Sequence, residues 1–327
     1  MVVVTGATGH LGSNLVPHLL ERGRALRCLV HGNPGTLAEQ GVEVARGDVR
    51  DLPSLVAAFD GADVVYHLAA KISIVGDPDG SVEAINVHGA ENVARACISA
   101  GVRRLVHCSS CHAFDINTPE PVDETRGGAG PKHPRYDQSK FRGEERVRAL
   151  VAEGLDAVIV NPSGVIGPND PEPSRMGHTL LGFARRTMPS MIDGGFDFVD
   201  VRDVVSSIVA ASERGRTGEN YLLGGYWTHV RELASYVEEV TGARPPLFTS
   251  PMWLAQVGAP LFSLWHALTG MEPLYTGEAL HALRATRQLS HAKAAEELGH
   301  APRPVRDSVH DALRDFAERG LIELPGG

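Results

Sequence analysis

The side-chain types and the spacing of Tyr136 and Lys140 indicate a pair that could do chemistry. On a helix, residues four apart lie on one face, so the two side chains would be neighbours. An ammonium beside a phenol favours the phenolate, and we therefore expect the pKa of Tyr136 to lie below its usual value. Such a phenol can donate a proton to a carbonyl oxygen as hydride arrives, or accept one from an alcohol in reverse. The spacing alone is common, so its weight depends on the motifs around it.

A serine hydroxyl is the expected third member of this group, because it could hold the substrate oxygen beside the phenol. Ser109 and Ser110 both follow an apolar run at residues 105–108 that predicts a strand. Open α/β sheets bind their ligands at the carboxyl edge, where both serines would lie. The pattern alone does not choose between them, since a predicted strand register slips easily by one residue.

A glycine-rich loop follows the first predicted strand and opens a predicted helix. Gly6 would permit a tight turn, Gly9 would let the backbone approach a pyrophosphate, and Gly12 would allow close packing of the helix on the strand. The start of the helix would offer free N–H groups and a positive dipole end to phosphates. The loop reads Thr5-Gly6-Ala7-Thr8-Gly9-His10-Leu11-Gly12. It predicts a dinucleotide site.

Short apolar runs alternate with helical stretches in the first half of the chain, which is typical of a parallel sheet with crossover helices. The predicted strands are residues 2–5, 26–30, 42–45, 64–68, 105–108 and 157–160. The predicted helices are residues 11–22, 52–59, 82–100 and 139–153. The expected fold class is therefore α/β, a doubly wound Rossmann sheet with a smaller C-terminal lobe.

The alternation breaks down after residue 164, where a Gly- and Pro-rich stretch begins. We expect a dinucleotide-binding lobe over residues 1–164 and a mainly substrate-binding lobe over residues 165–327. A later segment, about residues 197–225, is expected to return to the first lobe. Residues 115–135 hold several Pro and Gly and little apolar material, which predicts a surface loop.

Composition and charge exclude several classes of protein. A net charge of -9 argues against a nucleic-acid partner, because phosphate-binding surfaces need clustered Lys and Arg. The first residues read as a buried strand, so no signal or transit peptide is expected. Four cysteines in 327 residues do not make a disulfide framework, and we expect a cytoplasmic protein. Cys108 and Cys111 would point to opposite faces of a strand, so no metal site is expected.

Residues 245–271 carry no formally charged side chain. Gly258 and Pro260 interrupt the stretch, and polar side chains gather on one helical side, so it is a poor membrane span. Its apolar stripe instead predicts a helix that either packs in the core of the smaller lobe or lines a pocket there. These two readings stay open.

The chain resembles the extended branch of the short-chain dehydrogenase/reductase family, the NAD-dependent epimerase/dehydratase type. The resemblance runs nearly the full length, beginning with T-G-x-x-G-x-x-G at residues 5–12 and Y-x-x-x-K at residues 136–140. Further matching segments are Gly47-Asp48, His67-Leu68-Ala69-Ala70, Asn86-Val87-His88-Gly89, Asn161-Pro162-Ser163-Gly164-Val165-Ile166-Gly167-Pro168 and Phe198-Val199-Asp200-Val201-Arg202-Asp203-Val204. The family usually has R-P-x-x-V-Y-G-P where this chain has Asn161.

The resemblance implies a role for each matching position. Ser110, Tyr136, Lys140 and Asn86 would be catalytic, with Asn86 in a proton relay and Lys140 also holding the nicotinamide ribose. Asp48 would bond the adenine. The expected cofactor-binding residues are Thr5, Gly6, Thr8, Gly9, His10, Leu11, Gly12, His31, Asp48, Val49, Leu68, Ala69, Ala70, Lys71, Tyr136, Lys140, Asn161, Pro162, Ser163 and Val165. Family habit also implies a homodimer formed by two helices of the Rossmann lobe.

The end of the second predicted strand favours NADP over NAD. An NAD enzyme usually ends this strand with an acidic residue that bonds the ribose 2′-OH. Residues 28–33 hold no carboxylate. NADP-dependent members of the family place a basic residue just after the strand, and His31 stands there, although a partly protonated histidine is a weaker phosphate partner than arginine.

Departures from the family pattern reduce the number of reaction types that we expect for this chain. Cys111-His112 stand where dehydratases carry an Asp-Glu pair, and Phe114-Asp115 stand where epimerases often continue into Tyr-Gly. Residues 289–300 resemble the dihydroflavonol reductase and β-hydroxysteroid dehydrogenase groups. We therefore expect a carbonyl reductase or alcohol dehydrogenase for an apolar, ring-bearing carbonyl or alcohol. A nucleotide-sugar epimerase with tightly bound NAD remains the alternative, and a dinucleotide sensor without turnover is a third reading.

Overall fold

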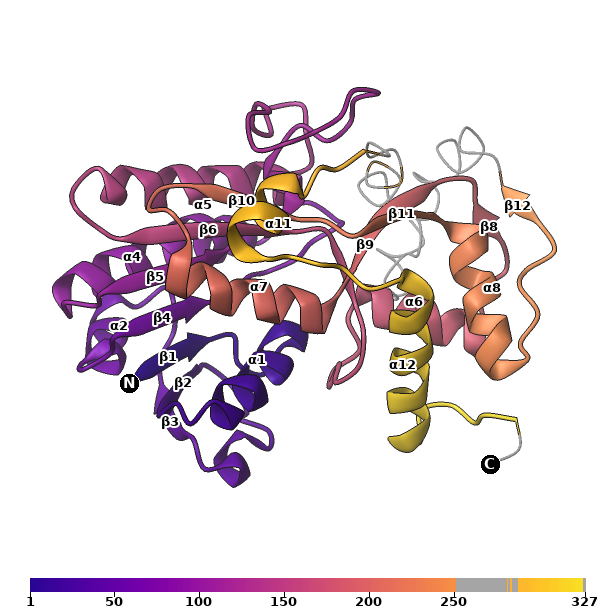
Figure 1. The fold of residues 1–327 in the computed structure, drawn as a ribbon, viewed down its shortest axis with the longest axis horizontal. Helices are drawn as coiled ribbons and strands as arrows, with labels where there is room; N and C mark the ends of the chain where they lie inside the picture. The colour runs from indigo at the N-terminus through magenta and orange to yellow at the C-terminus, as the bar shows by residue number, and fades with distance from the viewer. Residues whose placement is uncertain (251–280, 282, 284–287, 326–327) are drawn as a thin grey trace.

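The computed structural model describes residues 1–250, 281, 283 and 288–325. In this part of the chain seven parallel strands form one sheet, in the order β10-β6-β5-β4-β1-β2-β3 (Figure 1). The strands are β1 (Val2–Thr5), β2 (Leu26–Val30), β3 (Glu43–Arg46), β4 (Val64–His67), β5 (Arg104–Cys108), β6 (Ala157–Pro162) and β10 (Asn220–Leu223). The predicted doubly wound parallel sheet is confirmed.

Helices cover both faces of this sheet and bury it. One face packs against α1 (His10–Glu21), α7 (Val201–Arg214) and α11 (Ala292–Leu298). The other face packs against α2 (Leu52–Phe59), α4 (Ala90–Ser99) and α5 (Arg135–Val151). Because the central strands are covered on both sides, their sequences are nearly continuous apolar runs rather than alternating ones.

Two helix boundaries differ from the prediction in ways that affect the site. Helix α5 begins at Arg135, not at residue 139, because Pro134 stands at its N-cap, where a missing N–H is no loss. Tyr136 therefore lies in the first turn of the helix that also carries Lys140. The predicted helix 82–100 is divided into α3 (Ser81–Glu83), a π-helical turn at Ala84–Gly89 and α4.

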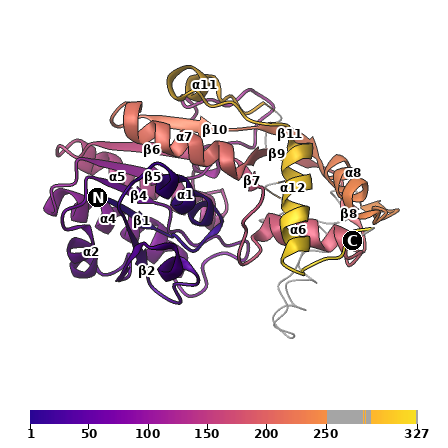
Figure 2. The same cartoon turned by 60° about the horizontal axis from the view of Figure 1, so that its bottom comes forward.

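A smaller lobe lies beside the large sheet (Figure 2). Its centre is a three-stranded sheet in the order β11-β9-β7, from Tyr226–His229, Gly195–Asp200 and Gly164–Ile166. Helices α6 (Arg175–Ala184), α8 (Val230–Thr241) and α12 (Val305–Glu318) share a separate core with this sheet. Two short strands, β8 (Met191–Ile192) and β12 (Thr249–Ser250), pair with each other.

The chain crosses between the lobes more than once. After β9 it continues into α7, which packs on the large sheet, and β10 then pairs with β6. The division at residue 164 stays a prediction. The helix predicted within residues 245–271 lies mostly outside the described residues. No described helix is long and apolar enough to cross a membrane.

Candidate active site

The glycine-rich loop adopts a backbone that its glycines alone permit. Gly6 has a φ of +71°, and a Cβ there would lie 2.6 Å from the backbone nitrogen of Ala69. A Cβ on Gly12 would lie 2.5 Å from the Cα of Ala7. A Cβ on Gly9 would instead meet only one atom within contact range, the Gly6 carbonyl oxygen at 3.6 Å. Gly6 and Gly12 are therefore required by the fold, whereas the exposed space over Gly9 suits a ligand.

The start of α1 has the features of a phosphate site. Gly9 is its N-cap, and no side chain caps the helix. The N–H groups of the first turn are thus free of side-chain partners, and they meet the positive end of the helix dipole. The residues present therefore fit a dinucleotide pyrophosphate.

These two glycines give a matched pair of variants. Gly12→Ala is expected to lower the free energy of unfolding by about 1–3 kcal/mol, because its Cβ would collide with backbone. Gly9→Ala is expected to leave the melting temperature nearly unchanged and to weaken dinucleotide binding, because the methyl group fills the space over the loop. Thermal unfolding and a fluorescence titration with the reduced dinucleotide measure both. Equal loss of stability in the two variants would contradict the assignment.

The ends of β1 and β4 are joined below this loop. The Thr5 hydroxyl lies 2.7 Å from His67 Nδ1 and accepts from the backbone nitrogen of Ala69. Leu68 donates its backbone N–H to the Thr5 carbonyl. Burial lowers the pKa of His67 to about 3, so its ring is neutral at physiological pH. The predicted cofactor segment from Leu68 to Ala70 is thereby fixed beneath the glycine loop.

Asn86 lies in the π-helical turn and ties it to the segment after β4. Its side chain accepts from the backbone nitrogen of Lys71 at 2.8 Å, and donates to the Lys71 carbonyl and to Ser139. The Lys71 ammonium contacts Asp79 and Ser81. Asn86 is buried beside α5 rather than in contact with Tyr136, so its relay role stays a prediction.

Ser110, Tyr136 and Lys140 come together at the carboxyl edge of the large sheet. The Ser110 hydroxyl lies beside the Tyr136 phenol and acts on its pKa. The Lys140 ammonium, buried one helical turn further along, donates to the Cys108 carbonyl at 3.0 Å. The hydroxyl of Ser109 is buried and has no hydrogen-bond partner among the described residues. The geometry thus favours Ser110 over Ser109 as the partner of the phenol.

The expected depression of the Tyr136 pKa is wrong for this arrangement. Burial raises the pKa of the phenol above its usual value, and the nearby Ser110 side chain opposes this only in part. Burial also lowers the pKa of Lys140, and the ammonium is engaged by Cys108. A neighbouring positive charge favours the phenolate, but here the cost of burying the phenolate is larger.

Asn161 belongs to a buried polar network behind Ser110. Its amide nitrogen donates to the Ser110 carbonyl at 2.9 Å and to Glu144 at 2.6 Å. Its amide oxygen accepts from Asn220 at 2.8 Å. Glu144, which lies one turn beyond Lys140 on α5, also accepts from Asn220 and Arg148. The Asn161 side chain is fully buried. Asn161 therefore holds the Ser110 backbone in place from behind.

The predicted nicotinamide loop is attached to both lobes. Ser163 donates its backbone N–H to the Leu223 carbonyl, and Val165 pairs with Val199 of β9. The Pro168 carbonyl accepts from Asn14 at 3.1 Å and lies 3.1 Å from His10 Nε2. The loop after Pro162 is therefore held against the helix that begins at the glycine motif.

Charged side chains gather at the ends of β2 and β3. His31 Nε2 lies 3.1 Å from Asp48, whose carboxylate also accepts from Arg50. The hydrogen bond from Arg50 holds the pKa of Asp48 below its usual value. Arg46, which the sequence reasoning missed, donates to the Gly32 carbonyl in the loop after β2. The sequence feature that could have indicated Arg46 is its position at the end of β3, the strand that pairs with β2.

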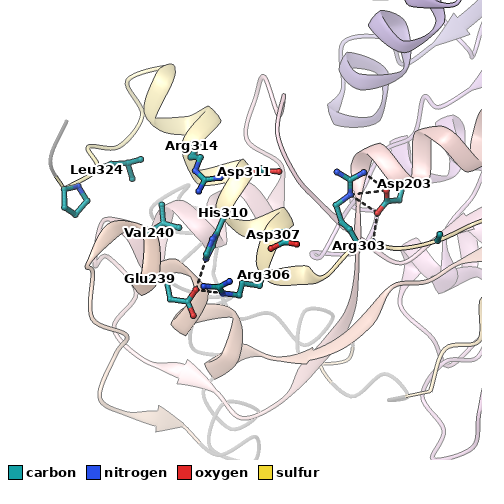
Figure 3. Close-up of a pocket in the computed structure, with 12 residues that line it drawn as sticks. Asp203, Glu239, Val240, Arg303, Arg306, Asp307, His310, Asp311, Arg314 and Leu324 are labelled. Atoms are coloured by element: carbon teal, nitrogen blue, oxygen red, sulfur yellow. Dashed lines mark hydrogen bonds and ion pairs between the residues drawn. The ribbon is translucent and has the colours of Figure 1, made fainter.

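A cysteine thiol, possible metal ligands and a surface pocket are the other candidate features outside the Ser110, Tyr136 and Lys140 group. Burial raises the pKa of the Cys108 thiol to about 11, so it is protonated at neutral pH. Among the described residues, no group of three His, Cys, Asp or Glu could hold a metal ion. A surface pocket of about 1050 Å³ is lined by charged residues of α7, α8 and α12, and Arg303–Asp203 and Arg306–Glu239 ion pairs satisfy much of its charge (Figure 3). None of the predicted catalytic residues lines it.

Comparison with known proteins assigns the family. A model described as the NAD dependent epimerase/dehydratase family matches residues 2–224, more than half of the chain. The chain belongs to this family. Its fold and its resemblance to the extended short-chain dehydrogenases/reductases, with the dihydroflavonol reductase-like and hydroxysteroid dehydrogenase groups among its relatives, are thereby confirmed. The family's enzymes depend on a nicotinamide cofactor and act on small molecules.

Two relatives cover nearly the whole chain. Sterol demethylase protein B of Methylococcus capsulatus is 35% identical over 98% of this chain and 99% of its own length. A Stigmatella aurantiaca protein, 4-hydroxy-2-methyl-3-oxo-4-farnesyl-3,4-dihydroquinoline-1-oxide ketoreductase, is 30% identical over 98% of both chains. Both names describe proteins similar to this one.

Two solved structures show the fold in known proteins. The crystal structure of gox2253 matches with a TM-score of 0.85 and 35% identity, over 99% of both chains. A Thermus thermophilus UDP-glucose 4-epimerase in complex with NAD matches with a TM-score of 0.78 and 22% identity, over 97% of this chain and 98% of its own. The second likeness shows the fold alone.

Proposed function

We propose that the protein is an NADP-dependent carbonyl reductase or alcohol dehydrogenase for an apolar, ring-bearing substrate. The observation that carries the proposal is the Ser110 hydroxyl beside the Tyr136 phenol, with Lys140 one turn further along the same helix. Ser110 would hold the substrate oxygen. Tyr136 would give it a proton in the direction of reduction and take it back in the direction of oxidation. The bound nicotinamide supplies or accepts the hydride.

The residues around Ser110 and Tyr136 fit the roles proposed for these two side chains. Lys140 would release the Cys108 carbonyl to hold the nicotinamide ribose, and its charge would favour the phenolate as the proton leaves. Asn161 and Glu144 keep Ser110 in place from behind. Since the network fixes the backbone of Ser110 before substrate arrives, little reorganisation of this residue is needed during reaction.

The substrate class rests on the relatives. The names of the two long relatives describe a sterol demethylase protein and a ketoreductase for a farnesylated ring with an oxo group. Both names refer to ring compounds with a large apolar part, the sterol skeleton in one and the farnesyl group in the other, which supports such a substrate here. The likenesses to UDP-glucose epimerases lie below 25% identity and support only the fold.

A substrate screen tests the proposal. Alicyclic and aromatic ketones, their alcohols and several nucleotide sugars are supplied with NADPH, NADH or the oxidised forms, and the nicotinamide absorbance is followed. We expect turnover of ketones or alcohols. Micromolar affinity for UDP or a UDP-sugar, NAD(H) that stays bound through purification, and no ketone turnover would instead establish the epimerase alternative.

The NADP preference gains support from Arg46. Arg46 is in register with Val30, the last residue of β2, and its guanidinium contacts the loop that follows His31. An arginine there can bond a ribose 2′-phosphate with two parallel donors, which a histidine cannot do. His31 is exposed and lies against Asp48, so it would be the secondary partner.

Variants at these two positions are expected to change the cofactor preference. Arg46→Ala should weaken NADPH binding by about 10–100-fold and NADH binding much less, because a charged hydrogen-bond partner of the 2′-phosphate is lost. His31→Asp should favour NADH, since a carboxylate repels the phosphate and can bond a free 2′-OH. Dissociation constants for both dinucleotides provide the measurement. A wild-type enzyme that uses NADH as well as NADPH would contradict the preference.

A further inference from the structure

His112 lies beside the reactive pair, at a position where the sequence showed only the loss of the dehydratase Asp-Glu pair. It belongs to a short 3-10 turn, Cys111–Ala113, directly after Ser110. Its backbone N–H donates to the Ser110 hydroxyl at 3.2 Å. Its ring meets the ring of Tyr136 edge-on, with the centroids 6.0 Å apart. Any substrate oxygen held by Ser110 and Tyr136 would therefore have the His112 ring as a neighbour.

The His112 ring is held from two further sides. It stacks on Phe196 of β9, with the centroids 5.5 Å apart and the planes 16° from parallel. Its Nδ1 lies 3.2 Å from Oδ1 of Asp137, the residue after Tyr136 on α5. The large sheet, helix α5 and the smaller lobe thus all contribute to the position of one imidazole, which restricts its rotation.

Asp137 determines which ring nitrogen is left for a ligand. Its side chain is 3% exposed, and apart from His112 no ion pair or hydrogen bond joins its carboxylate to a described residue. A buried carboxylate needs a compensating partner, so it favours the tautomer with hydrogen on Nδ1 even though the two atoms are at ion-pair distance rather than in a well-aligned hydrogen bond. The Nε2 atom has no hydrogen bond to a described residue and is not among the fully buried polar atoms.

We propose that His112 Nε2 binds a substrate hydroxyl on the carbon next to the reacting carbonyl or alcohol carbon. Two rings in edge contact can bring their polar atoms to oxygens on neighbouring carbons. A hydroxyl suits Nε2 in both protonation states, because it donates to the neutral ring and accepts from the charged one. A second carbonyl or a carboxylate would pair only with the charged ring. The substrate class is then an α-hydroxy ketone, or a vicinal diol in the direction of oxidation.

This inference rests on the proposed oxidoreductase function, so its test compares two ketones in one assay. The probes are a cyclic ketone and the same ring with a hydroxyl on the neighbouring carbon, with NADPH absorbance giving kcat/KM for each. The wild-type enzyme is expected to prefer the hydroxy ketone by tenfold or more. His112→Phe, which keeps an aromatic ring against Phe196 but has no ring nitrogen, is expected to reduce this ratio about tenfold.

Further variants separate a specific contact from a structural effect. His112→Asn is the second replacement, in case the phenylalanine variant fails to fold. Asp137→Asn is expected to reduce the same ratio to a smaller extent, because Nε2 remains but its tautomer is no longer fixed. Thermal unfolding and NADPH binding show whether each variant is folded. A purely structural role would lower the melting temperature and leave the ratio of the two substrates unchanged.

The possible outcomes are distinct. No preference in the wild-type enzyme, or the same ratio in the folded His112 variants, overturns the hydroxyl contact while the ketone turnover still supports the proposed function. Failure of the wild-type enzyme to turn over either ketone overturns the proposed function, and this inference with it.

Discussion

Tyr136→Phe is expected to reduce kcat by about 10²–10⁴-fold, the usual cost of losing one acid/base group. The ring and its packing remain, and only the hydroxyl beside Ser110 is lost. Because burial keeps this phenol protonated, it is ready to donate a proton in the direction of reduction. Steady-state rates with the best ketone from the screen measure the effect.

The same variant should bind the dinucleotide nearly as tightly as the wild-type enzyme does. The phenol acts in the transition state, so its removal should lower kcat and kcat/KM together with little change in cofactor affinity. A fluorescence titration with NADPH provides this control. Wild-type turnover in Tyr136→Phe would show that the proton comes from another group, and the mechanism would have to be reassigned.

Glu144→Ala is expected to lower the free energy of unfolding by about 3–5 kcal/mol, because it breaks a buried ionic network. Glu144 is almost fully buried and accepts from Asn161, Asn220 and Arg148. Removal of the carboxylate leaves two interior amides and a guanidinium with one acceptor fewer each. Urea unfolding followed by circular dichroism measures the change.

The neighbouring Glu145→Ala is the matched control. Glu145 is exposed on the same helix, and a surface substitution of this kind usually changes stability by less than about 0.5 kcal/mol. Any folded Glu144→Ala protein should also have a lower kcat, since Asn161 would no longer be held against the Ser110 carbonyl. Equal stabilities for the two variants would show that the network is dispensable.

The sequence was most informative where a local rule applies. The glycine spacing predicted the turn correctly. A Cβ on Gly12 would collide with Gly6 and Ala7, which are close in the chain, whereas a Cβ on Gly6 would collide with Leu68 and Ala69 in the segment after β4. The buried parallel strands were found from a local pattern, since strands covered on both faces need continuous apolar runs. The predicted helix boundaries were less accurate. Helix α5 begins directly after Pro134, four residues before the predicted start at residue 139.

The candidate site was only partly predictable. Tyr136 and Lys140 share a helix, so their spacing alone places them on one face. No recognised motif gave a role to Arg46, Glu144 or His112. The role that we propose for each depends on a partner elsewhere in the fold. Arg46 matters because β3 pairs with β2, and Glu144 because β6 brings Asn161 to α5.

The sequence by itself determined the order of strands and helices, the dinucleotide loop and the tyrosine–lysine pair, because these depend on short-range periodicity and on the space that a glycine leaves. Only the tertiary structure decided which serine meets the phenol, how burial raises the pKa of Tyr136, and that Phe196 and Asp137 hold His112 beside it. Burial and contacts between distant segments are properties of the packed chain. No local pattern of residues encodes them, since a shift of one residue in a strand would exchange the faces on which Ser109 and Ser110 lie.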